Sequence, residues 1–461
     1  MLDRPVLDCP VLDCIVLGAG LAGLSAATDL VANGRSVVVL EARERVGGRV
    51  ETGVLSDGQV VDLGGQWLAD GHTRMHELTT RLGLSLVSPS SGDVTVRLGG
   101  NVSQVPSRDE LATSLNPFEL ADLGEGLARF RHLAERIADD PTWARGNTTW
   151  LSRPLVRWVT SNLRTPAGQD WFGRVFRASF RTDPEAITLS EGLHRANSGT
   201  DMEALIAVNG GVRQRRVVGG SSGICRRLAD DLGEAVRLSS VVTSVAQTDD
   251  TVTVTLASGE QLVARSVINT LPPKFAAALT HEPALPEWRH ELAAKVPPGN
   301  VIKAFLVYPT PWWRERGRSG QMGSDRGPVR VSFDATDDAQ GSGRGVLLGF
   351  FAGPEADGWG QKSAYLRQRA FTEAVTAAFG PAPAEPLEYV DRDWSAERFT
   401  GGCHGAHFAP GVWTASGPAL AEPNGREFFA GAEYATTFNG YMEGAVRSGS
   451  AAAAQVMQAL A

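Results

Sequence analysis

The sequence predicts an α/β fold, and two observations near its N-terminus carry this prediction. A short apolar run at residues 14–17 leads directly into Gly18-Ala19-Gly20-Leu21-Ala22-Gly23, a G-x-G-x-x-G turn followed by an alanine-rich stretch. A second run, 36–40, is mainly β-branched and ends in Glu41. This order of elements predicts the β-α-β unit of a Rossmann-type dinucleotide-binding domain: a strand, a glycine-rich turn, a helix and a second strand that ends in an acid.

The residues of the glycine-rich turn have different expected roles. Gly18 allows a tight change of direction from strand to helix, and Gly20 allows the backbone to approach a pyrophosphate. Gly23 lets the helix pack closely on the strand. Leu21 and Ala22 lie at the helix start, where free N–H groups and the helix dipole attract an anion.

Glu41 completes the motif at the end of the second strand. It stands about twenty residues after the turn, where a carboxylate can accept hydrogen bonds from ribose hydroxyls. A glycine-rich turn alone is weak evidence, because it can be purely structural. Its position between two strands, with an acid after the second, favours a bound dinucleotide.

Composition narrows the class of protein. The chain has 461 residues, of which 42% are hydrophobic and 21% charged, as expected for a soluble globular protein. Its net charge of −8 gives no reason to expect nucleic-acid or anionic-membrane binding. No apolar run is long enough for a membrane-spanning helix.

The N-terminus and the cysteines point to a cytoplasmic protein. The first residues are acidic and interrupted by proline, unlike a signal peptide, and 1–11 are expected to form a disordered tail. The four cysteines are far apart, so no disulfide framework and no metal site are expected; they are Cys9, Cys14, Cys225 and Cys403.

Two further segments resemble the flavin monoamine oxidase family. The sequence continues after Glu41 as Ala42-Arg43-Glu44-Arg45-Val46-Gly47-Gly48-Arg49, and a later strand ends in Gly64-Gly65-Gln66-Trp67. Taken alone, the first segment could be a basic surface turn. The resemblance covers almost the whole chain and implies FAD rather than NAD as the cofactor. It also implies a soluble, bacterial-type enzyme, because the chain stops where membrane-bound members carry an anchor.

The resemblance implies cofactor contacts in several distant segments. A backbone contact to adenine is implied at Val242, and the start of the last helix is expected to face the flavin. The implied cofactor-binding residues beyond the glycine-rich turn are Glu41, Ala42, Arg43, Gly48, Arg49, Gly64, Gly65, Gln66, Trp67, Val242, Cys403, Gly431, Glu433, Gly440, Tyr441 and Met442.

The implied architecture is of the glutathione-reductase type, with a Rossmann-like FAD-binding domain interleaved with a mixed α+β substrate domain. Residues 87–209 read as an inserted, mostly helical cap whose tryptophans are expected to lie in its core. The expected FAD-binding segments are 12–86, 210–285 and 392–461, and the expected substrate-domain segments are 87–209 and 286–391.

Lys303 is the main candidate for chemistry. It lies in the predicted strand Val301–Tyr308 among apolar neighbours, and a lysine is rarely buried without a partner. The matching lysine of the family holds a water against flavin N5. The alternative is an exposed lysine at a strand surface.

Cys403 is a candidate for covalent attachment of the flavin. The segment Gly401-Gly402-Cys403-His404 resembles the family's Gly-Gly-Cys-Tyr, in which the cysteine bonds to the flavin 8α carbon. Many soluble relatives lack this bond, and a buried cysteine is often only a small hydrophobic residue. The sequence leaves both alternatives open.

Two departures from the family concern the substrate. His404 replaces a tyrosine that, with the tyrosine matching Tyr441, forms an aromatic cage around the amine; an imidazole adds a polar, titratable edge. Arg213 stands where the family has a glutamine beside the substrate, and an arginine there could bind a carboxylate. Alternatively, a one-residue slip leaves that role to Gln214.

The leading hypothesis is therefore FAD-dependent oxidation of a small-molecule amine. The resemblance implies transfer of the α-carbon hydrogen to flavin N5, hydrolysis of the resulting imine to a carbonyl, and reduction of O₂ to H₂O₂. An L-amino-acid oxidase is the alternative that Arg213 supports. Carotenoid desaturases, protoporphyrinogen oxidases and a flavin-binding scaffold without turnover are weaker alternatives, because Lys303 and Tyr441 suit amine oxidation. A homodimer is one possible assembly.

Overall fold

The computed structural model describes residues 11–69, 71–88, 90, 92–98, 101–105, 116–180, 184–197, 215–324, 326–352, 354–403 and 418–461. Two compact units are formed, each from segments that are far apart in the sequence. The first unit comprises Met1–Arg49, Ile224–Pro297 and Pro418–Ala461. The second comprises Val50–Gly223 and Pro298–Gly417.

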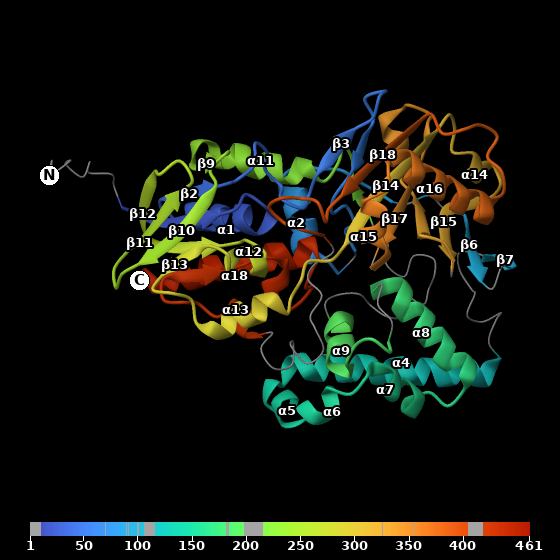
Figure 1. Cartoon of the computed structure of the whole chain (residues 1–461), viewed down its shortest axis with the longest axis horizontal. Coiled ribbons are helices and arrows are strands. Elements are labelled where there is room, and N and C mark those ends of the chain that lie inside the picture. The colour runs from blue at the N-terminus through green and yellow to red at the C-terminus, as the bar shows by residue number, and fades with distance from the viewer. Residues whose placement is uncertain are drawn as a thin grey trace. The chain divides into compact units, whose positions relative to one another are not determined.

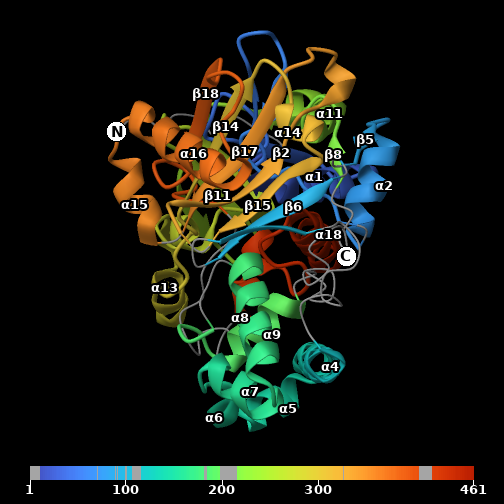
Figure 2. The same ribbon diagram turned by 90° about the vertical axis from the view of Figure 1, so that its right-hand side faces the viewer.

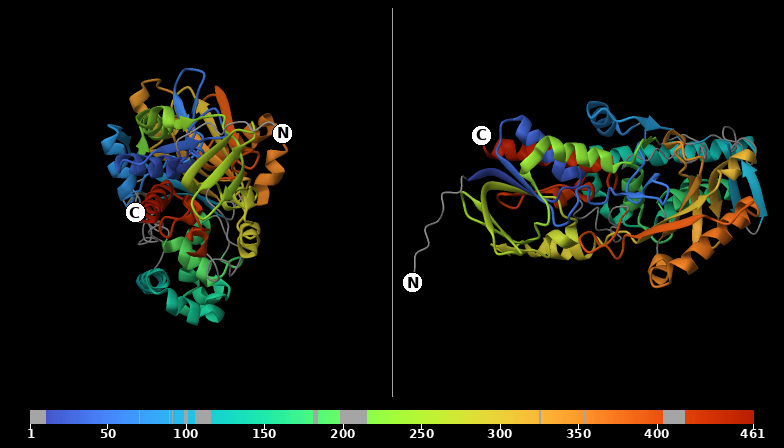
Figure 3. Two further views of the ribbon diagram at one scale, coloured as in Figure 1. Left: turned by 90° about the vertical axis from the view of Figure 1, so that its left-hand side faces the viewer. Right: turned by 90° about the horizontal axis from the view of Figure 1, so that it is seen from above.

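The first unit is built on an eight-stranded sheet with the order β13-β10-β11-β12-β1-β2-β9, in which β19 also pairs with β12. Strand β1 is parallel to both β2 and β12, as the β-α-β prediction requires. Strands β10 to β12 form an antiparallel meander, which can be followed in yellow-green in Figure 3. The strands are β1 (Leu12–Leu17), β2 (Val37–Leu40), β9 (Val236–Arg237), β10 (Val242–Gln247), β11 (Val252–Leu256), β12 (Gln261–Asn269), β13 (Thr280–Glu282) and β19 (Glu427–Phe429).

The helix α1 (Leu21–Ala32) follows the glycine-rich turn and packs against the last helix, α18 (Met442–Ala459) (Figure 1). The two helices approach closely: a Cβ added at Gly449 would lie 2.2 Å from the carbonyl oxygen of Ala22. The N-terminal and C-terminal segments therefore form one layer. Shorter helices of this unit are α12 (Pro273–Ala276) and α13 (Glu287–Ala294), and α11 (Ser222–Leu232) begins at the unit boundary.

The second unit contains a seven-stranded sheet with the order β18-β14-β17-β16-β15-β6-β7. Its inner strand β14 (Val301–Tyr308) is buried at all eight positions, and it pairs antiparallel with β17 and β18. The other strands are β6 (Asp93–Leu98), β7 (Asn101–Val105), β15 (Arg318–Ser324), β16 (Val329–Asp334), β17 (Gly345–Ala352) and β18 (Glu388–Asp393).

Two small strand pairs and several helices complete this sheet region. The pairs are β3 (Thr52–Val54) with β4 (Val60–Asp62), and β5 (Leu86–Val87) with β8 (Arg216–Val217). The helix α16 (Ala364–Phe379) contributes Phe371 and Phe379 to the sheet's core. The remaining helices here are α2 (Thr73–Arg81), α14 (Trp312–Glu315) and α15 (Pro354–Gly360).

The rest of the second unit is helical, and Figure 2 shows its helices gathered together. They are α4 (Pro117–Asp139), α5 (Pro141–Gly146), α6 (Thr148–Leu151), α7 (Leu155–Asn162), α8 (Pro166–Phe180) and α9 (Leu189–Asn197). Helix α4 begins with a capping box between Asn116 and Glu119, which satisfies otherwise free N–H groups. These helices agree with the expectation of a mostly helical region within 87–209.

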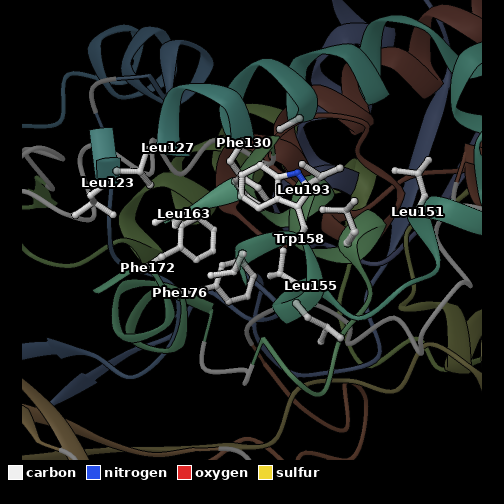
Figure 4. Close-up of a cluster of buried hydrophobic side chains, with 14 of the residues drawn as sticks. Leu123, Leu127, Phe130, Leu151, Leu155, Trp158, Leu163, Phe172, Phe176 and Leu193 are labelled. Carbon is white, nitrogen blue, oxygen red and sulfur yellow. The ribbon is translucent and has the colours of Figure 1, made fainter. Parts of the chain in front are cut away.

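An aromatic cluster holds these helices together (Figure 4). The ring of Phe130 lies 5.0 Å from that of Trp158 and 5.2 Å from that of Phe172, and Phe172 stacks on Phe176. Trp143, Trp150 and Trp171 pack against the same cluster. The prediction that the tryptophans of this region are core residues is confirmed for Trp158, and the other three are partly buried against the same core. No helix in the described ranges is long and apolar enough to cross a membrane.

The two units divide the chain differently from the expected domains. Residues 50–86, 210–223 and 392–417 were expected with the FAD-binding segments, but they cluster with the second unit. Pairing explains this: β8 pairs with β5, and the Trp394 indole N–H donates to the Leu63 carbonyl at 2.9 Å. The division by function into FAD-binding and substrate domains stays a prediction.

We expect Asp122→Ala to destabilise the helical region by about 2–3 kcal/mol, because it leaves buried N–H groups without an acceptor. The Asp122 carboxylate accepts hydrogen bonds from the N–H groups of Arg164 and Thr165, at 2.8–3.0 Å, and from the Thr165 hydroxyl. The free energy of unfolding, measured with urea, checks this. Asp140→Ala is the control: this exposed N-cap accepts one bond, from the Trp143 N–H, and its loss should cost about 1 kcal/mol.

The Asp122 effect should also depend on pH. Burial raises the pKa of this carboxyl, but the donors of Arg164 and Thr165 outweigh burial and lower it below its ordinary value. A lowered folded-state pKa contributes stability above the unfolded-state pKa, and this contribution is lost as the pH falls. The wild-type advantage over Asp122→Ala should therefore shrink below about pH 4. A difference that stays constant on acidification would contradict this explanation.

Candidate active site

The glycine-rich turn has the geometry of a phosphate cradle. Gly18 has a φ of +100°, and a Cβ at Gly23 would lie only 2.0 Å from the Gly18 carbonyl oxygen. Gly20 is the N-cap of α1, and no side chain caps this helix start. The first turn of α1 also contains no acidic residue. The N–H groups of Leu21 and Ala22 thus begin a helix that is suited to an anion.

Glu41 is held at the end of β2 by backbone groups. Its side chain is 3% exposed, and its carboxylate accepts hydrogen bonds from the Ala19 N–H at 2.8 Å and the Arg43 N–H at 3.0 Å. The Arg43 guanidinium lies 3.3 Å from the same carboxylate. The predicted acid therefore lies directly beside the glycine-rich turn, where a ribose would meet it.

The loop after Glu41 folds back onto the turn. The Gly47 N–H donates to the Ala19 carbonyl at 2.8 Å, and Gly20 and Gly47 form a parallel bridge. Gly48 has a φ of +56°, and a Cβ there would lie 3.6 Å from the Gly20 Cα. Ala42 is half-buried in the same loop. The glycines of both segments keep side chains away from the surface that a pyrophosphate would approach.

An ion pair joins this loop to the last segment of the chain. The two guanidinium nitrogens of Arg49 donate to the two carboxylate oxygens of Glu433 at 2.5 and 2.7 Å, and Glu433 is 1% exposed. The sequence analysis places both residues at the cofactor but does not predict that they pair. Charge-assisted bidentate pairs of this kind combine strength with a fixed geometry.

The segment around Glu433 prepares the start of α18. Gly431 has a φ of +143° and exchanges hydrogen bonds with the Ser448 hydroxyl. Gly440 has a φ of +81°, and its N–H donates to the Ala432 carbonyl at 3.0 Å. Tyr441 is the N-cap of α18, and Met442 is its first residue.

Val242 is the predicted adenine contact, and it lies in the sheet of the first unit. Val242 is the first residue of β10 and pairs with Leu256 of β11. Its side chain is half-buried. The implied contact of Val242 with adenine stays a prediction.

In the second unit, the structure brings Lys303 together with the Gly-Gly-Gln-Trp segment. The Lys303 ammonium donates to the Gly64 carbonyl at 2.7 Å and to the Gln66 side-chain oxygen at 2.5 Å. Lys303 is 4% exposed, so the alternative of a surface lysine is wrong. Burial with two hydrogen-bond acceptors fixes the direction of the ammonium group. Gly65 lies between the two acceptors in this turn.

Trp67 and Cys403 border the same unit's core. The Trp67 ring lies 5.8 Å from the Phe333 ring, and the Arg216 guanidinium lies 5.9 Å from the Trp67 ring centre. The Cys403 N–H donates to the Gly299 carbonyl at 2.9 Å, and the side chain is half-buried. A Cβ at Gly402 would lie 2.6 Å from the Gly299 oxygen, so the backbone before Cys403 is closely packed.

Three predicted substrate residues, Arg213, Gln214 and His404, lie outside the described residues. One residue that the sequence analysis missed is Asp62, which is buried shortly before the Gly-Gly turn and interacts electrostatically with Lys303. The signal was present, because an acid at the end of an apolar strand leads into that turn as Val60-Val61-Asp62-Leu63.

Comparisons with known proteins agree with this geometry. The family described as flavin containing amine oxidoreductase matches residues 21–457, nearly the full length. The chain belongs to this family. The flavin-containing amine oxidase A of Bos taurus is 29% identical over 447 residues, which cover 96% of this chain and 84% of the bovine protein.

Solved structures of other amine oxidases have the same fold. Putrescine oxidase bound to putrescine superposes with a TM-score of 0.88 at 27% identity, covering 97% of this chain and 99% of that one. Cyclohexylamine oxidase from Brevibacterium oxydans IH-35A gives a TM-score of 0.85 at 30% identity, covering 98% and 100%. The predicted architecture is confirmed. Membership of the flavin-containing family shows that this chain uses FAD.

The residues of the first unit fit the adenosine diphosphate part of FAD. The uncapped start of α1 and the open glycine surface suit the pyrophosphate, and the buried Glu41 carboxylate suits ribose hydroxyls. The expectation that this chain oxidises amines with FAD is confirmed by its family. The roles of the individual site residues stay predictions.

Proposed function

We propose that this enzyme oxidises a small amine without a carboxylate at its α-carbon, giving an imine that hydrolyses to a carbonyl compound, and reduces O₂ to H₂O₂. The observation that carries this proposal is the buried Lys303 ammonium, fixed by the Gly64 carbonyl and Gln66. The substrate class is supported by two similar structures, named for putrescine and cyclohexylamine oxidases; neither amine has a carboxylate.

The residues of the chain prepare the site for chemistry that the flavin supplies. When bound, the flavin accepts the hydrogen of the amine's α-carbon and passes electrons to O₂. Lys303 would supply a fixed positive charge and would donate a hydrogen bond to an ordered water. Tyr441 and His404 are proposed to flank the amine and orient its α-carbon. Gln66 keeps the Lys303 ammonium from turning away.

An anaerobic titration tests the substrate class. Putrescine, cyclohexylamine, benzylamine and a panel of L-amino acids are added to the oxidised enzyme, and the loss of oxidised-flavin absorbance is followed. Amines without a carboxylate should bleach the flavin, and admitting air should restore the absorbance with release of H₂O₂. Bleaching by amino acids alone would overturn the proposal in favour of an amino-acid oxidase. Arg213→Gln should then abolish the preference for carboxylates. No bleaching by any amine would favour a scaffold without turnover.

We further propose that Cys403 attaches the flavin covalently, because its backbone is fixed on the Gly299 carbonyl and its side chain is half-buried. Acid precipitation should leave the yellow colour in the protein pellet, and the protein mass should include FAD. Cys403→Ala should release the colour into the supernatant. Cys225→Ala is the matched control, because this buried cysteine lies on α11 and should not affect colour retention. A colourless wild-type pellet would show that FAD is bound without a covalent bond.

A further inference from the structure

A small cavity lies beside the Lys303 site in the second unit. Its free volume is about 10 Å³, which is room for about one water molecule. The polar residues that line it are Asp62, Gln66, Arg216, Asp337 and Gln340. A cavity of this size with polar walls is suited to a buried water, which usually makes about three hydrogen bonds.

Two buried donors at this cavity have no acceptor in the described part of the chain. They are the Gln66 side-chain amide nitrogen and the Arg216 Nε. The other Arg216 nitrogens donate to the carbonyls of Ala335 and Thr336, both at 2.8 Å. The Gln66 oxygen must face Lys303, because an ammonium can only donate, so the amide nitrogen is turned away from it. A buried N–H group without an acceptor is costly, and a water would remove that cost.

Asp62 can supply the acceptor that such a water needs. Its Oδ1 already accepts from the Ser221 N–H at 2.8 Å and the Thr52 hydroxyl at 2.9 Å, while its Oδ2 accepts, within the described ranges, only from the Ser221 hydroxyl, at 3.2 Å. The Asp337 oxygens each accept one bond as well, from the Ala339 N–H at 3.1 Å and from the Gln340 amide at 2.9 Å. Oδ2 of Asp62 thus has spare acceptor capacity at this cavity, and Asp62 is also the carboxylate on which Lys303 acts electrostatically.

We propose that Asp62 is a positioning residue for Lys303, acting by its charge and through one buried water that it shares with Gln66 and Arg216. The water accepts from the Gln66 amide and from Arg216 Nε, and it donates to Asp62. This arrangement fixes the Gln66 amide with its oxygen toward Lys303. The importance of Asp62 for catalysis rests on the proposed function of Lys303. The effect of Asp62 on the Lys303 ammonium does not depend on that function.

Asp62 is a counter-ion of Lys303. Arg392 of β18 is the cross-strand partner of Lys303, but it pairs with the carboxylates of Glu51 and Glu397. The Asp62 carboxylate, on β4, interacts electrostatically with the Lys303 ammonium. Burial raises the pKa of the Asp62 carboxyl, and Lys303, Ser221 and Thr52 oppose this rise. The carboxylate and the ammonium thus stabilise each other's charge.

Lysine is rare enough in this chain to test the proposal directly. The sequence contains four lysines, which are Lys274, Lys295, Lys303 and Lys362. The holoenzyme is labelled with ¹³Cε-lysine, and the four ¹³Cε signals are followed by NMR between about pH 6 and pH 10. Lys303→Arg assigns the Lys303 signal by its disappearance. The other three signals serve as internal references.

The Lys303 signal should stay at its protonated position over this range in the wild type and move toward the neutral position within it in Asp62→Asn. Asp337→Asn is the matched control, because it also neutralises a buried carboxylate at the cavity but leaves Asp62 in place. It should leave the Lys303 signal unchanged. An unchanged signal in Asp62→Asn, or the same movement in both variants, would overturn the proposal.

A second variant keeps the proposal testable if Asp62→Asn does not fold. Gln66→Met removes the amide that links the water to Lys303, and it should also shift the Lys303 signal; an unchanged signal would overturn the proposal. The proposed function is tested by a different result: it is wrong if amines do not bleach the flavin of the wild type. A Lys303 signal that depends on Asp62 in an enzyme without amine turnover would leave the positioning role intact.

Discussion

Replacing Lys303 with methionine is expected to slow reoxidation of the amine-reduced enzyme by O₂ by about a hundredfold, the usual effect of removing one fixed donor from developing negative charge. The ammonium is buried and aimed by the Gly64 carbonyl and the Gln66 oxygen, so its charge acts where water cannot screen it. Methionine keeps the length and apolar body of the side chain. The rate is measured by stopped-flow after mixing the reduced enzyme with O₂.

The control for this experiment is Lys362→Met. Lys362 is exposed and lies 4.8 Å from the Trp359 ring centre, outside the proposed site. Its replacement should leave the reoxidation rate unchanged. Equal rates in wild type and Lys303→Met, in a variant that still binds FAD, would exclude a role for Lys303 in the reaction with O₂. Lys303→Arg separates charge from shape, because it keeps the charge but cannot fit the same two acceptors in the same way.

Local patterns in the sequence predict most of the secondary structure around the site. The strand, glycine turn and helix at 14–32 depend on residues that are neighbours in sequence, and the structure has β1, the turn and α1 in those places. The predicted strand Val301–Tyr308 coincides with β14. These elements follow from periodicity, turn residues and burial, which are local properties.

The partners of the site residues could not be predicted in the same way. Lys303 bonds to Gly64 across 239 positions of sequence, and Arg49 pairs with Glu433 across 384. Such pairs depend on how the strands and helices pack, and a single sequence contains no periodic signal for them. The resemblance to a known family therefore indicated which residues belong to the cofactor site, but not which of them hold one another. Asp62 was missed for the same reason, because its partner Lys303 is on another strand.

The Arg49–Glu433 pair should have the largest effect on stability. Arg49→Met should lower the free energy of unfolding by about 3–5 kcal/mol, because it leaves the carboxylate of Glu433 buried without its counter-ion. The same variant should retain less FAD after gel filtration, since the pair joins the loop after Glu41 to the segment before α18. Urea unfolding and the ratio of flavin to protein absorbance are the measurements.

The chain contains a matched control for this pair in the same unit. Arg237 and Glu260 form a bidentate pair of the same kind at 2.8 and 2.7 Å, but their side chains are 35% and 46% exposed. Arg237→Met should therefore cost about 0.2–1 kcal/mol, because solvent screens the pair and can solvate the remaining carboxylate. Adding Glu433→Gln to Arg49→Met should recover part of the loss, since it removes the unpaired buried charge. Similar losses from Arg49→Met and Arg237→Met, or no recovery in the double variant, would show that burial of Glu433 does not determine the strength of this pair.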